Sequence, residues 1–310
     1  MPDFDPVTYA VPAFILLVLA EMVWSRFRAP RAYEPRDTAV SLLFGLGSTV
    51  MGALTAGMVL AMLVALHQFR LFDIGWHWWA LALCFVLDDL AYYWFHRLAH
   101  RVRWFWASHV NHHSSQHYNL STALRQSWTG FIAISFVFRW PLALIGFEPA
   151  MILLCGGLNL IYQFWIHTEV IGRMPRWFEA VMNTPSHHRV HHATNPAYLD
   201  RNYAGTFIVW DKLFGTFQPE LEGTQIRYGI VRQLGGFNIL WALFHEWVGI
   251  ARDVWAAPWR HKAGYVWREP GWSHDGSRDT SDTIRARWLQ RENAAPGNAA
   301  NDTAVATPAE

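Results

Sequence analysis

Charged residues are scarce in this chain. They make up 16% of its 310 residues, whereas they account for about a quarter of a typical soluble domain. Hydrophobic residues make up 52% of the sequence and aromatic residues 16%. This balance argues against an ordinary soluble domain and indicates a membrane protein.

Cysteine and net charge are low as well. The two cysteines, Cys84 and Cys155, both lie inside apolar runs, which argues against a disulfide framework. Two thiols cannot alone form a cysteine-rich metal site, so we expect both to be buried as small hydrophobic side chains. The net charge is +1 and the sequence has no basic nucleic-acid motif, so a nucleic-acid partner is not expected.

Long apolar runs recur in the first half of the chain. A helix that crosses a bilayer needs about 20 residues, most of them apolar. The candidate runs are 7–24, 40–66, 74–95, 129–147 and 150–166. The N-terminus has the acidic residues Asp3 and Asp5 but no basic region, so we expect the first run to be retained rather than cleaved. We therefore predict an all-α integral membrane protein with about four to five membrane-embedded helices.

Arginines predict how the chain is inserted. Four of them lie in the segment 26–36, between the first two runs, and basic loops usually face the cytoplasm. The N-terminus would then lie outside, and the third run would end at His96 on the cytoplasmic side. Residues 129–166 are typical of a hairpin that enters from the cytoplasm and returns, interrupted by Arg139 and Pro141. His167 would then emerge on the same side.

Histidines recur at helical spacings close to the ends of these runs. They form one pair and two triplets: His96 and His100; His109, His112 and His113; His188, His191 and His192. Residues three and four apart share one face of a helix, so each triplet would point its imidazoles the same way. Converging imidazoles repel when charged and lose solvation when neutral, whereas a metal ion binds them as neutral ligands. The repetition predicts a metal site rather than a set of solvated or buried histidines.

Other histidines are less informative. His167 stands alone in the sequence, but the topology places it near the others. His187 would face away from its neighbours on a helix, so ligation and a role behind the ligands both stay open. An ordinary solvated or structural role is expected for the remaining histidines: His67, His77, His117, His245, His261 and His274.

Two carboxylates are candidates to orient the ligands. Asp89 lies seven residues before His96, on the same helical face and inside an apolar run, where an unpaired charge is costly. A carboxylate that accepts the second N–H of a ligating histidine is satisfied and fixes the ring, so we favour this role over a buried ion pair. Asp211 is a second candidate for the same role.

These motifs, in this order and between apolar runs, resemble the histidine boxes of the fatty acid hydroxylase (sterol desaturase) superfamily of membrane di-iron enzymes. The boxes are HRLAH at 96–100, HVNHH at 109–113 and HRVHH at 188–192. Three longer stretches resemble the branch of that family that oxidises alkylglycerol ethers: 112–127, 164–170 and 183–217. The similarity runs from about residue 88 to residue 217.

The resemblance implies two iron ions, dioxygen as the oxidant and hydroxylation at a lipid carbon. It assigns the pair, both triplets and His167 as metal ligands, with no catalytic residue beyond them. Some members have a further histidine one turn before the third box. This chain has Gln163 there, so that ligand is replaced, or supplied by His187 or a water. For the ether-oxidising branch, the resemblance implies tetrahydrobiopterin as the reductant. The sequence has no Gly-rich dinucleotide fingerprint or flavin motif, so we expect an external electron donor.

Several activities fit the histidine boxes. The leading prediction is a lipid monooxygenase, acting on an alkylglycerol ether or another lipid; the alternative is a fatty acid, sterol or carotenoid hydroxylase or desaturase. A metal-binding transporter or a membrane haem protein is a remote alternative, because polar ligands in a transporter usually lie near mid-bilayer. We predict four parts: membrane helices (1–73), a cytoplasmic histidine-box di-iron domain (74–217), amphipathic or interfacial helices (218–272) and a disordered tail (273–310).

Overall fold

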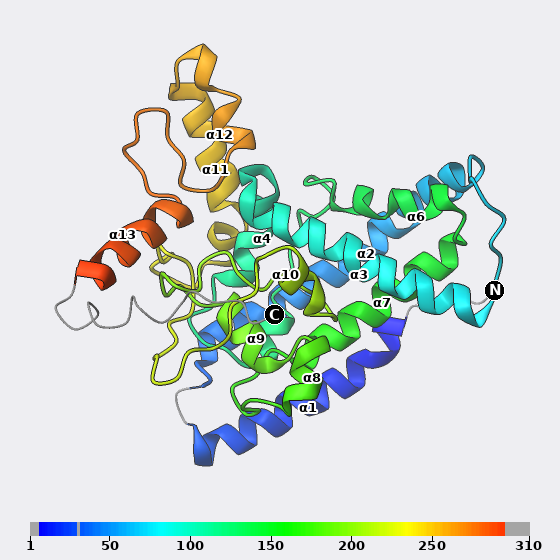
Figure 1. Ribbon diagram of the computed structural model, residues 1–310, viewed down its shortest axis with the longest axis horizontal. Coiled ribbons are helices and arrows are strands. Elements are labelled where there is room, and N and C mark those ends of the chain that lie inside the picture. Colours follow the sequence, from blue (N-terminus) through cyan, green and yellow to red (C-terminus); the bar gives the residue numbers. More distant parts are fainter. Residues whose placement is uncertain (1–5, 30–31, 295–310) are drawn as a thin grey trace, which may run out of the picture.

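The computed structural model describes residues 6–29 and 32–294. All regular secondary structure in these residues is helical, with two isolated bridges and no β-strand. The α-helices are α1 (Pro6–Arg28), α2 (Pro35–His67), α3 (Trp78–Arg101), α4 (Arg103–His113), α5 (Leu120–Ala123), α6 (Trp140–Ile145), α7 (Pro149–Trp165), α8 (Arg176–Val181), α9 (Pro185–His191), α10 (Val209–Leu213), α11 (Ile239–Ala256), α12 (Gly264–Trp267) and α13 (Ser281–Ala294). Two 3-10 helices are η1 (Ser135–Arg139) and η2 (Trp259–His261). The predicted all-α fold is confirmed (Figure 1).

Helices α1 and α2 are long, apolar and largely uncovered by the rest of the chain. They have 23 and 33 residues, and only 11% and 6% of their most apolar windows are buried. At the start of α2, the Glu34 carboxylate accepts a hydrogen bond from the backbone N–H of Asp37, which caps the helix. Farther along, Leu46 and Leu54 are 65% and 73% exposed. A helix that is apolar on all sides needs an apolar environment, so both are suited to cross a bilayer.

Helices α3 and α7 form the centre of the fold. α3 packs against α4 and α7, and α7 also lies along α1 (Figure 1). Cys84 of α3 and Cys155 of α7 belong to the same buried apolar cluster, and both are free thiols, as expected. The helix of the third apolar run continues beyond residue 95, because α3 extends to Arg101 and carries His96 and His100 in its last turns.

The fourth apolar run, 129–147, is interrupted, as the sequence predicts at Arg139 and Pro141. It forms turns, then η1 and the short α6. Arg139 turns inward to pair with the buried Asp88, with Nε 2.6 Å from Oδ1, and Pro141 has no N–H to continue a helical ladder. An ion pair across the fold and a proline therefore interrupt the run. Of the helices in the described ranges, only α1 and α2 are long and apolar enough to span a membrane, so the count of four to five stays a prediction.

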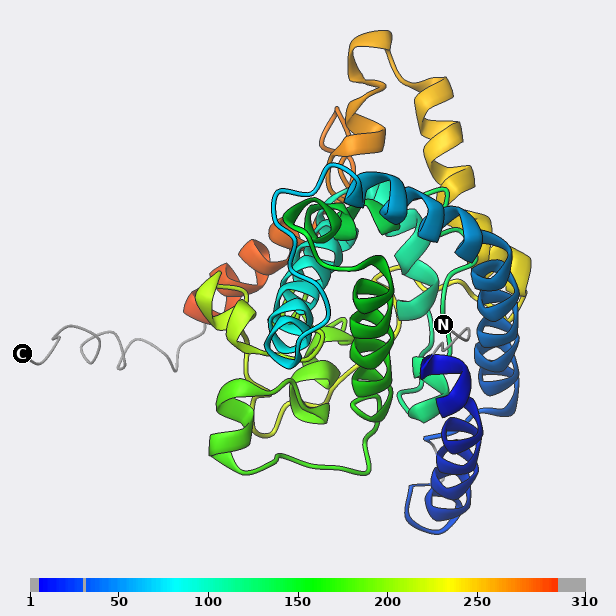
Figure 2. The same cartoon turned by 90° about the vertical axis from the view of Figure 1, so that its right-hand side faces the viewer.

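Helices α11 and α12 project from the body of the molecule in both views (Figures 1 and 2). α11 extends to Ala256 and lies within the segment 218–272, for which amphipathic or interfacial helices are predicted. Its N-cap is Asn238, whose side chain accepts a hydrogen bond from the backbone N–H of Trp241 at 3.0 Å.

The predicted disordered tail is wrong for its first part, because α13 occupies residues 281–294. At its start, Thr280 and Thr283 exchange hydrogen bonds between hydroxyl and backbone N–H groups. Asp282 pairs with Arg101 of α3 at 2.6 Å. The serine, threonine and aspartate residues that suggested disorder act here as residues that start a helix. The rest of the predicted tail lies outside the described residues.

Candidate metal centre

Four stretches bring the predicted histidines together. α3 and α4 are consecutive helices that pack against each other. His167 follows the end of α7, and α9 begins with proline in its first turn, where the missing N–H costs nothing. Eight of the nine predicted ligands are buried and His109 is half-buried. All nine therefore lie in the interior of one helical assembly.

The nine histidines form two groups, within each of which the ligand nitrogens lie no more than 4.8 Å apart. Group A consists of His96, His100, His109, His113 and His191. Group B consists of His112, His167, His188 and His192. Neither group contains a carboxylate or a thiol.

This division corrects the prediction that each triplet points to a single place. On α4, His109 and His113 join group A, whereas His112 joins group B. The triplet at 188–192 divides in the same way, with His191 apart from the other two. Successive residues of a helix are about 100° apart, so residues four apart differ by only about 40° and adjacent residues by about 100°. One short helix can thus supply two neighbouring sites.

Hydrogen bonds to backbone carbonyls fix the tautomers of His167 and His112 in group B. Nδ1 of His167 lies 2.7 Å from the Gln163 carbonyl, and Nδ1 of His112 lies 3.3 Å from the Arg125 carbonyl. A carbonyl only accepts, so Nδ1 carries the proton and Nε2 of each neutral ring has a lone pair. The two Nε2 atoms are nevertheless 3.2 Å apart, and Nε2 of His188 lies 3.0 Å from that of His167. Facing lone pairs repel, and a cation between them removes the conflict.

Group A has the same pattern. His96 and His191 donate Nδ1–H to carbonyl oxygens at 2.7 and 2.9 Å. Nε2 of His96 lies 2.9 Å from that of His109. In the described part of the chain, Nε2 of His100 and of His191 are buried without a hydrogen-bond partner. Orphaned buried nitrogens at a convergence of imidazoles fit a metal ion.

Burial keeps these rings neutral. It lowers the pKa of His113, His188 and His192 well below the usual imidazole value, and neighbouring imidazoles lower it further. Neutral imidazole is the form that binds metal ions. Both groups therefore present neutral nitrogen donors.

The side chains of two other candidate ligands have partners of their own. His187 packs its ring against Phe217. The side-chain amide of Gln163 donates a hydrogen bond to Asn159 at 2.8 Å. Its backbone carbonyl accepts a hydrogen bond from Nδ1–H of His167. Gln163 thus orients a histidine through its backbone, and its side chain points elsewhere.

Asp89 does not contact a histidine, so the predicted hydrogen bond to His96 is wrong. Its carboxylate accepts hydrogen bonds from the backbone N–H groups of Thr206 and Phe207 at 2.7 and 2.9 Å, and from the indole N–H of Trp210 at 2.9 Å. Seven residues of helix rise by about 10 Å, which is too far for one hydrogen bond. A shared face of α3 therefore did not bring the two side chains together.

Asp211 does not touch a histidine either, but it acts on one indirectly. It accepts hydrogen bonds from the backbone N–H groups of Tyr203 and Ala204, both at 2.8 Å. The Tyr203 carbonyl in turn accepts a hydrogen bond from Nδ1–H of His96 at 2.7 Å. Asp89 and Asp211 thus hold the 203–207 loop from its two ends, and that loop fixes the ring.

The carboxylate that does contact a ring is Asp200, which sequence reasoning missed. Its Oδ1 lies 3.3 Å from Nδ1 of His100, and its Oδ2 lies 3.4 Å from Arg101. The backbone φ of Asp200 is +55°, a conformation that aspartate adopts more readily than most residues. Carboxylates in this position commonly orient metal-binding histidines. No helical spacing relates residue 200 to residue 100, so only the tertiary fold reveals the pair.

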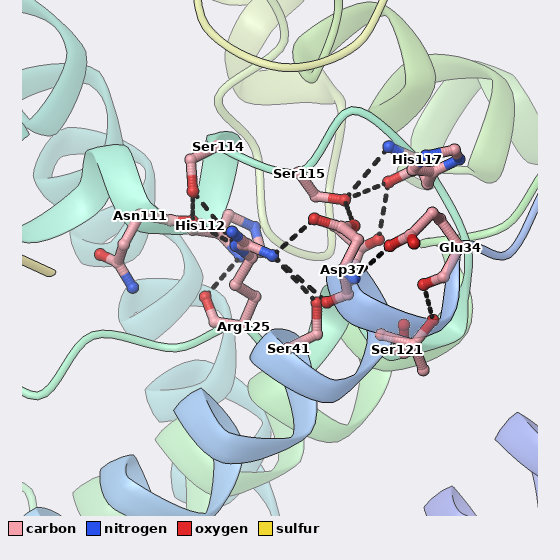
Figure 3. Close-up of polar contacts among 12 residues, drawn as sticks. Glu34, Asp37, Ser41, Asn111, His112, Ser114, Ser115, His117, Ser121 and Arg125 are labelled. Carbon is pink, nitrogen blue, oxygen red and sulfur yellow. Dashed lines mark hydrogen bonds and ion pairs between the residues drawn. The ribbon is translucent and has the colours of Figure 1, made fainter. Parts of the chain in front are cut away.

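A buried ion pair behind group B connects α2 to α4. Arg125 Nη1 lies 3.0 Å from Asp37 Oδ1, and these side chains are only 3% and 8% exposed. Arg125 Nε also donates to the Asn111 carbonyl at 2.9 Å and to the Ser114 hydroxyl at 3.1 Å. The backbone carbonyl of Arg125 accepts a hydrogen bond from Nδ1–H of His112 (Figure 3). The network therefore ties the end of α4, which supplies His112, to the first turn of α2.

Residues 81–216 match the protein-family model for fatty acid hydroxylases. The chain carries a fatty acid hydroxylase domain. All nine grouped histidines lie within the hydroxylase domain. The resemblance stated from the histidine boxes is confirmed.

Relatives extend the match beyond the hydroxylase domain. The chain is 39% identical over 284 residues to alkylglycerol monooxygenase of Danio rerio and 40% identical over 278 residues to that of Homo sapiens. These alignments cover 86% and 88% of the chain but only 60% of each relative, so the chain spans about 60% of the length of these curated relatives. Ornithine lipid hydroxylase OlsE of Rhizobium tropici is 28% identical over 148 residues, 47% of the chain and 44% of the relative. No solved structure is significantly similar to the chain.

Membrane attachment follows from both observations. α1 and α2 are long, apolar and almost entirely uncovered, and the residues that follow them match fatty acid hydroxylases. Together these observations indicate an integral membrane protein.

Proposed function

We propose that this chain is a di-iron monooxygenase that uses dioxygen to hydroxylate a C–H bond of a membrane lipid. The observation that carries the proposal is the pair of histidine groups, in which bare imidazole nitrogens converge. The names of the relatives, alkylglycerol monooxygenase and ornithine lipid hydroxylase, support oxidation of a lipid.

Group A would hold one iron and group B the other. Imidazole also suits zinc, copper and nickel, and the match to the hydroxylase family favours iron. Two irons, when bound, supply the oxidation of an unactivated C–H bond, which no amino-acid side chain can perform. The protein would position the ligands: the carbonyls of Tyr203 and Gln163 hold ring protons on Nδ1, and Asp200 orients His100. Burial of the imidazoles would keep bulk water away.

An alkylglycerol ether lipid is the first candidate substrate. Relatives that bear this substrate in their name align with more than four fifths of the chain, at 39% and 40% identity. A fatty acid, sterol or carotenoid hydroxylase or desaturase is the second candidate, since the chain is also 26% identical over 189 residues to a Delta(7)-sterol 5(6)-desaturase of Gibberella zeae. A metal transporter or haem protein is disfavoured, because the histidines gather at the ends of helices in sets of five and four.

The electrons would come from an external donor, since the sequence has no dinucleotide or flavin fingerprint. For an ether lipid, we propose tetrahydrobiopterin as that reductant. We also propose that both histidine groups face the cytoplasm, which the arginines in the segment 26–36 support. Residues 1–73 would supply membrane helices, 74–217 the di-iron unit and 218–272 helices at the interface.

Comparative lipidomics of host cells with and without the chain tests the reaction. Loss of an ether lipid supports ether oxidation, gain of one oxygen atom supports hydroxylation, and loss of two hydrogens supports desaturation. His191→Ala removes a nitrogen from group A and should abolish the change, whereas His245→Ala, on α11 and outside both groups, should preserve it. If iron-loaded wild-type protein with a supplied reductant alters no lipid, the proposal is wrong.

A further inference from the structure

The exposed side of α11 is apolar. Trp241, Phe244, Val248 and Trp255 are 49%, 41%, 49% and 88% exposed. Their spacings of three, four and seven residues place them on one face of the helix. Ala251, which fills the remaining position of this stripe, is exposed too. A helix that borders water normally presents its polar side to the solvent. α11 instead exposes mainly apolar side chains, with Arg252 as an exposed charged residue.

The acidic side chains of α11 face the protein. Asp253 is 7% exposed and pairs with Arg103 at 2.7 Å and with Arg278 at 2.6 Å. Glu246 pairs with the same Arg103, with 2.5 Å between Oε1 and Nε. Arg103 is the first residue of α4. The helix therefore places its carboxylates against the hydroxylase domain and its largest apolar groups outside.

The apolar stripe of α11 begins beside a membrane helix. Ala242 and Leu243 of α11 pack with Phe44 near the start of α2. At this junction α2 exposes its own leucines, with Leu43 at 49% and Leu46 at 65%. From there α11 projects crosswise to α3 (Figure 1) and extends beyond the bundle in the second view (Figure 2). The stripe thus continues the lipid-facing surface of α2 sideways.

Tryptophans and arginines flank the far end of α11. Trp259 and Trp267, in the turns that follow, are 85% and 56% exposed, and Arg252 and Arg260 are exposed near them in the sequence. Tryptophan concentrates at membrane–water interfaces, where its ring meets apolar chains and its N–H stays hydrated. Basic side chains attract anionic head groups. Together these residues match the chemistry of the head-group layer of an anionic bilayer.

We propose that α11 and the turns up to Trp267 lie flat in the head-group layer of the bilayer that α1 and α2 cross. The face formed by Trp241, Phe244, Val248 and Trp255 is turned to lipid. Because Arg103 joins α11 to α4, this contact sets how far the histidine groups lie from the lipid surface. The inference rests on the membrane location in the proposed function and not on its metal chemistry.

Labelled cysteines test this contact. Both native cysteines are buried, so a cysteine introduced at the surface can be labelled selectively with an environment-sensitive fluorophore. Val248→Cys and Trp255→Cys report on the proposed face. Leu43→Cys on α2 is the lipid-facing reference, and Gln290→Cys on the exposed side of α13 is the water-facing reference. The full chain is reconstituted in vesicles that contain phosphatidylcholine and an anionic phospholipid.

We expect a lipid-borne nitroxide to quench the labels at 248 and 255 about as strongly as the label at 43. Aqueous iodide should quench them several-fold less than the label at 290. Iodide quenching equal to that at 290 would show that the face meets water and would overturn the proposal. Shielding from both quenchers would overturn it in favour of a second protein copy. Two labelled positions keep the test valid if one variant fails to fold, and neither readout needs iron or turnover.

Discussion

The ion pair between Asp37 and Arg125 offers a direct test of how the fold positions the histidines. Asp37→Asn keeps the shape of the side chain but removes the negative charge beside Arg125, whose side chain is 3% exposed. Arg125 also donates a hydrogen bond to the Asn111 carbonyl, and its own backbone carbonyl accepts one from Nδ1–H of His112. A displaced Arg125 therefore moves the end of α4 and the ring of His112 with it.

Two magnitudes follow for this variant. Removing one partner of a buried ion pair costs about 3–5 kcal/mol of folding free energy. Asn can still accept one hydrogen bond from Arg125, so we expect a loss near the lower end of that range. Losing a residue that orients a metal ligand weakens metal affinity by about 10–100-fold. His112 belongs to group B, so we expect weaker binding of one ion while the ion in group A remains.

Iron titration of the purified protein measures this effect as bound iron per chain at each free iron concentration. Asp253→Asn is the matched control, because Asp253 is a buried partner of Arg103 at the opposite end of α4. It should lower stability and leave both ions bound. Full iron affinity in Asp37→Asn would refute the reasoning, and equal loss of both ions would indicate general unfolding instead of positioning.

Substitution of two adjacent histidines should remove the ion from different groups. We expect His191→Ala and His192→Ala each to lower bound iron from two ions to one, as measured by elemental analysis. Loss of both ions from either single variant would contradict the division into groups. Asp89→Asn would turn an amide toward the N–H groups of Thr206 and Phe207, so we expect a loss of about 1–3 kcal/mol in unfolding assays, with lower turnover. Wild-type stability and turnover would show that the loop needs no charge there. A cysteine in place of Arg28 should react with a membrane-impermeant reagent only from the cytoplasmic side. Labelling from outside would reverse the proposed orientation.

The meeting of the histidines was predictable because helical spacing is a local property. Residues three and four apart on α4 and α9 necessarily lie close, and the topology added His167 to them. The division into two groups was also implicit in the geometry, since His112 and His113 differ by about 100° around the helix axis. Spacing alone, however, does not show how many ions a cluster accepts. That number still stays a prediction.

The partners of the histidines were not predictable in this way. Asp200 meets His100 because the chain turns with a positive φ at residue 200, and nothing near either residue indicates this. Arg139 is recognisable in the sequence as an interruption of its apolar run, whereas its partner Asp88 is revealed only by the fold. Hydropathy counts residues within one window, whereas a buried charge is tolerated only through a partner elsewhere in the fold.

The carboxylates around the site show why such partners matter. Neither group of ligands contains a negative charge, so the charge of bound ions has to be offset from farther away. Asp200 touches a ring of group A, while Asp89 and Asp211 are fully buried behind the 203–207 loop. In the described part of the chain, these two accept hydrogen bonds from N–H and O–H groups and form no ion pairs. A buried carboxylate without a cation is costly, and nearby positive charge lowers that cost. The 203–207 loop, which fixes His96, therefore also keeps the carboxylates of Asp89 and Asp211 near the positive charge that metal ions would bring. Burial of these carboxylates is thus coupled to metal binding.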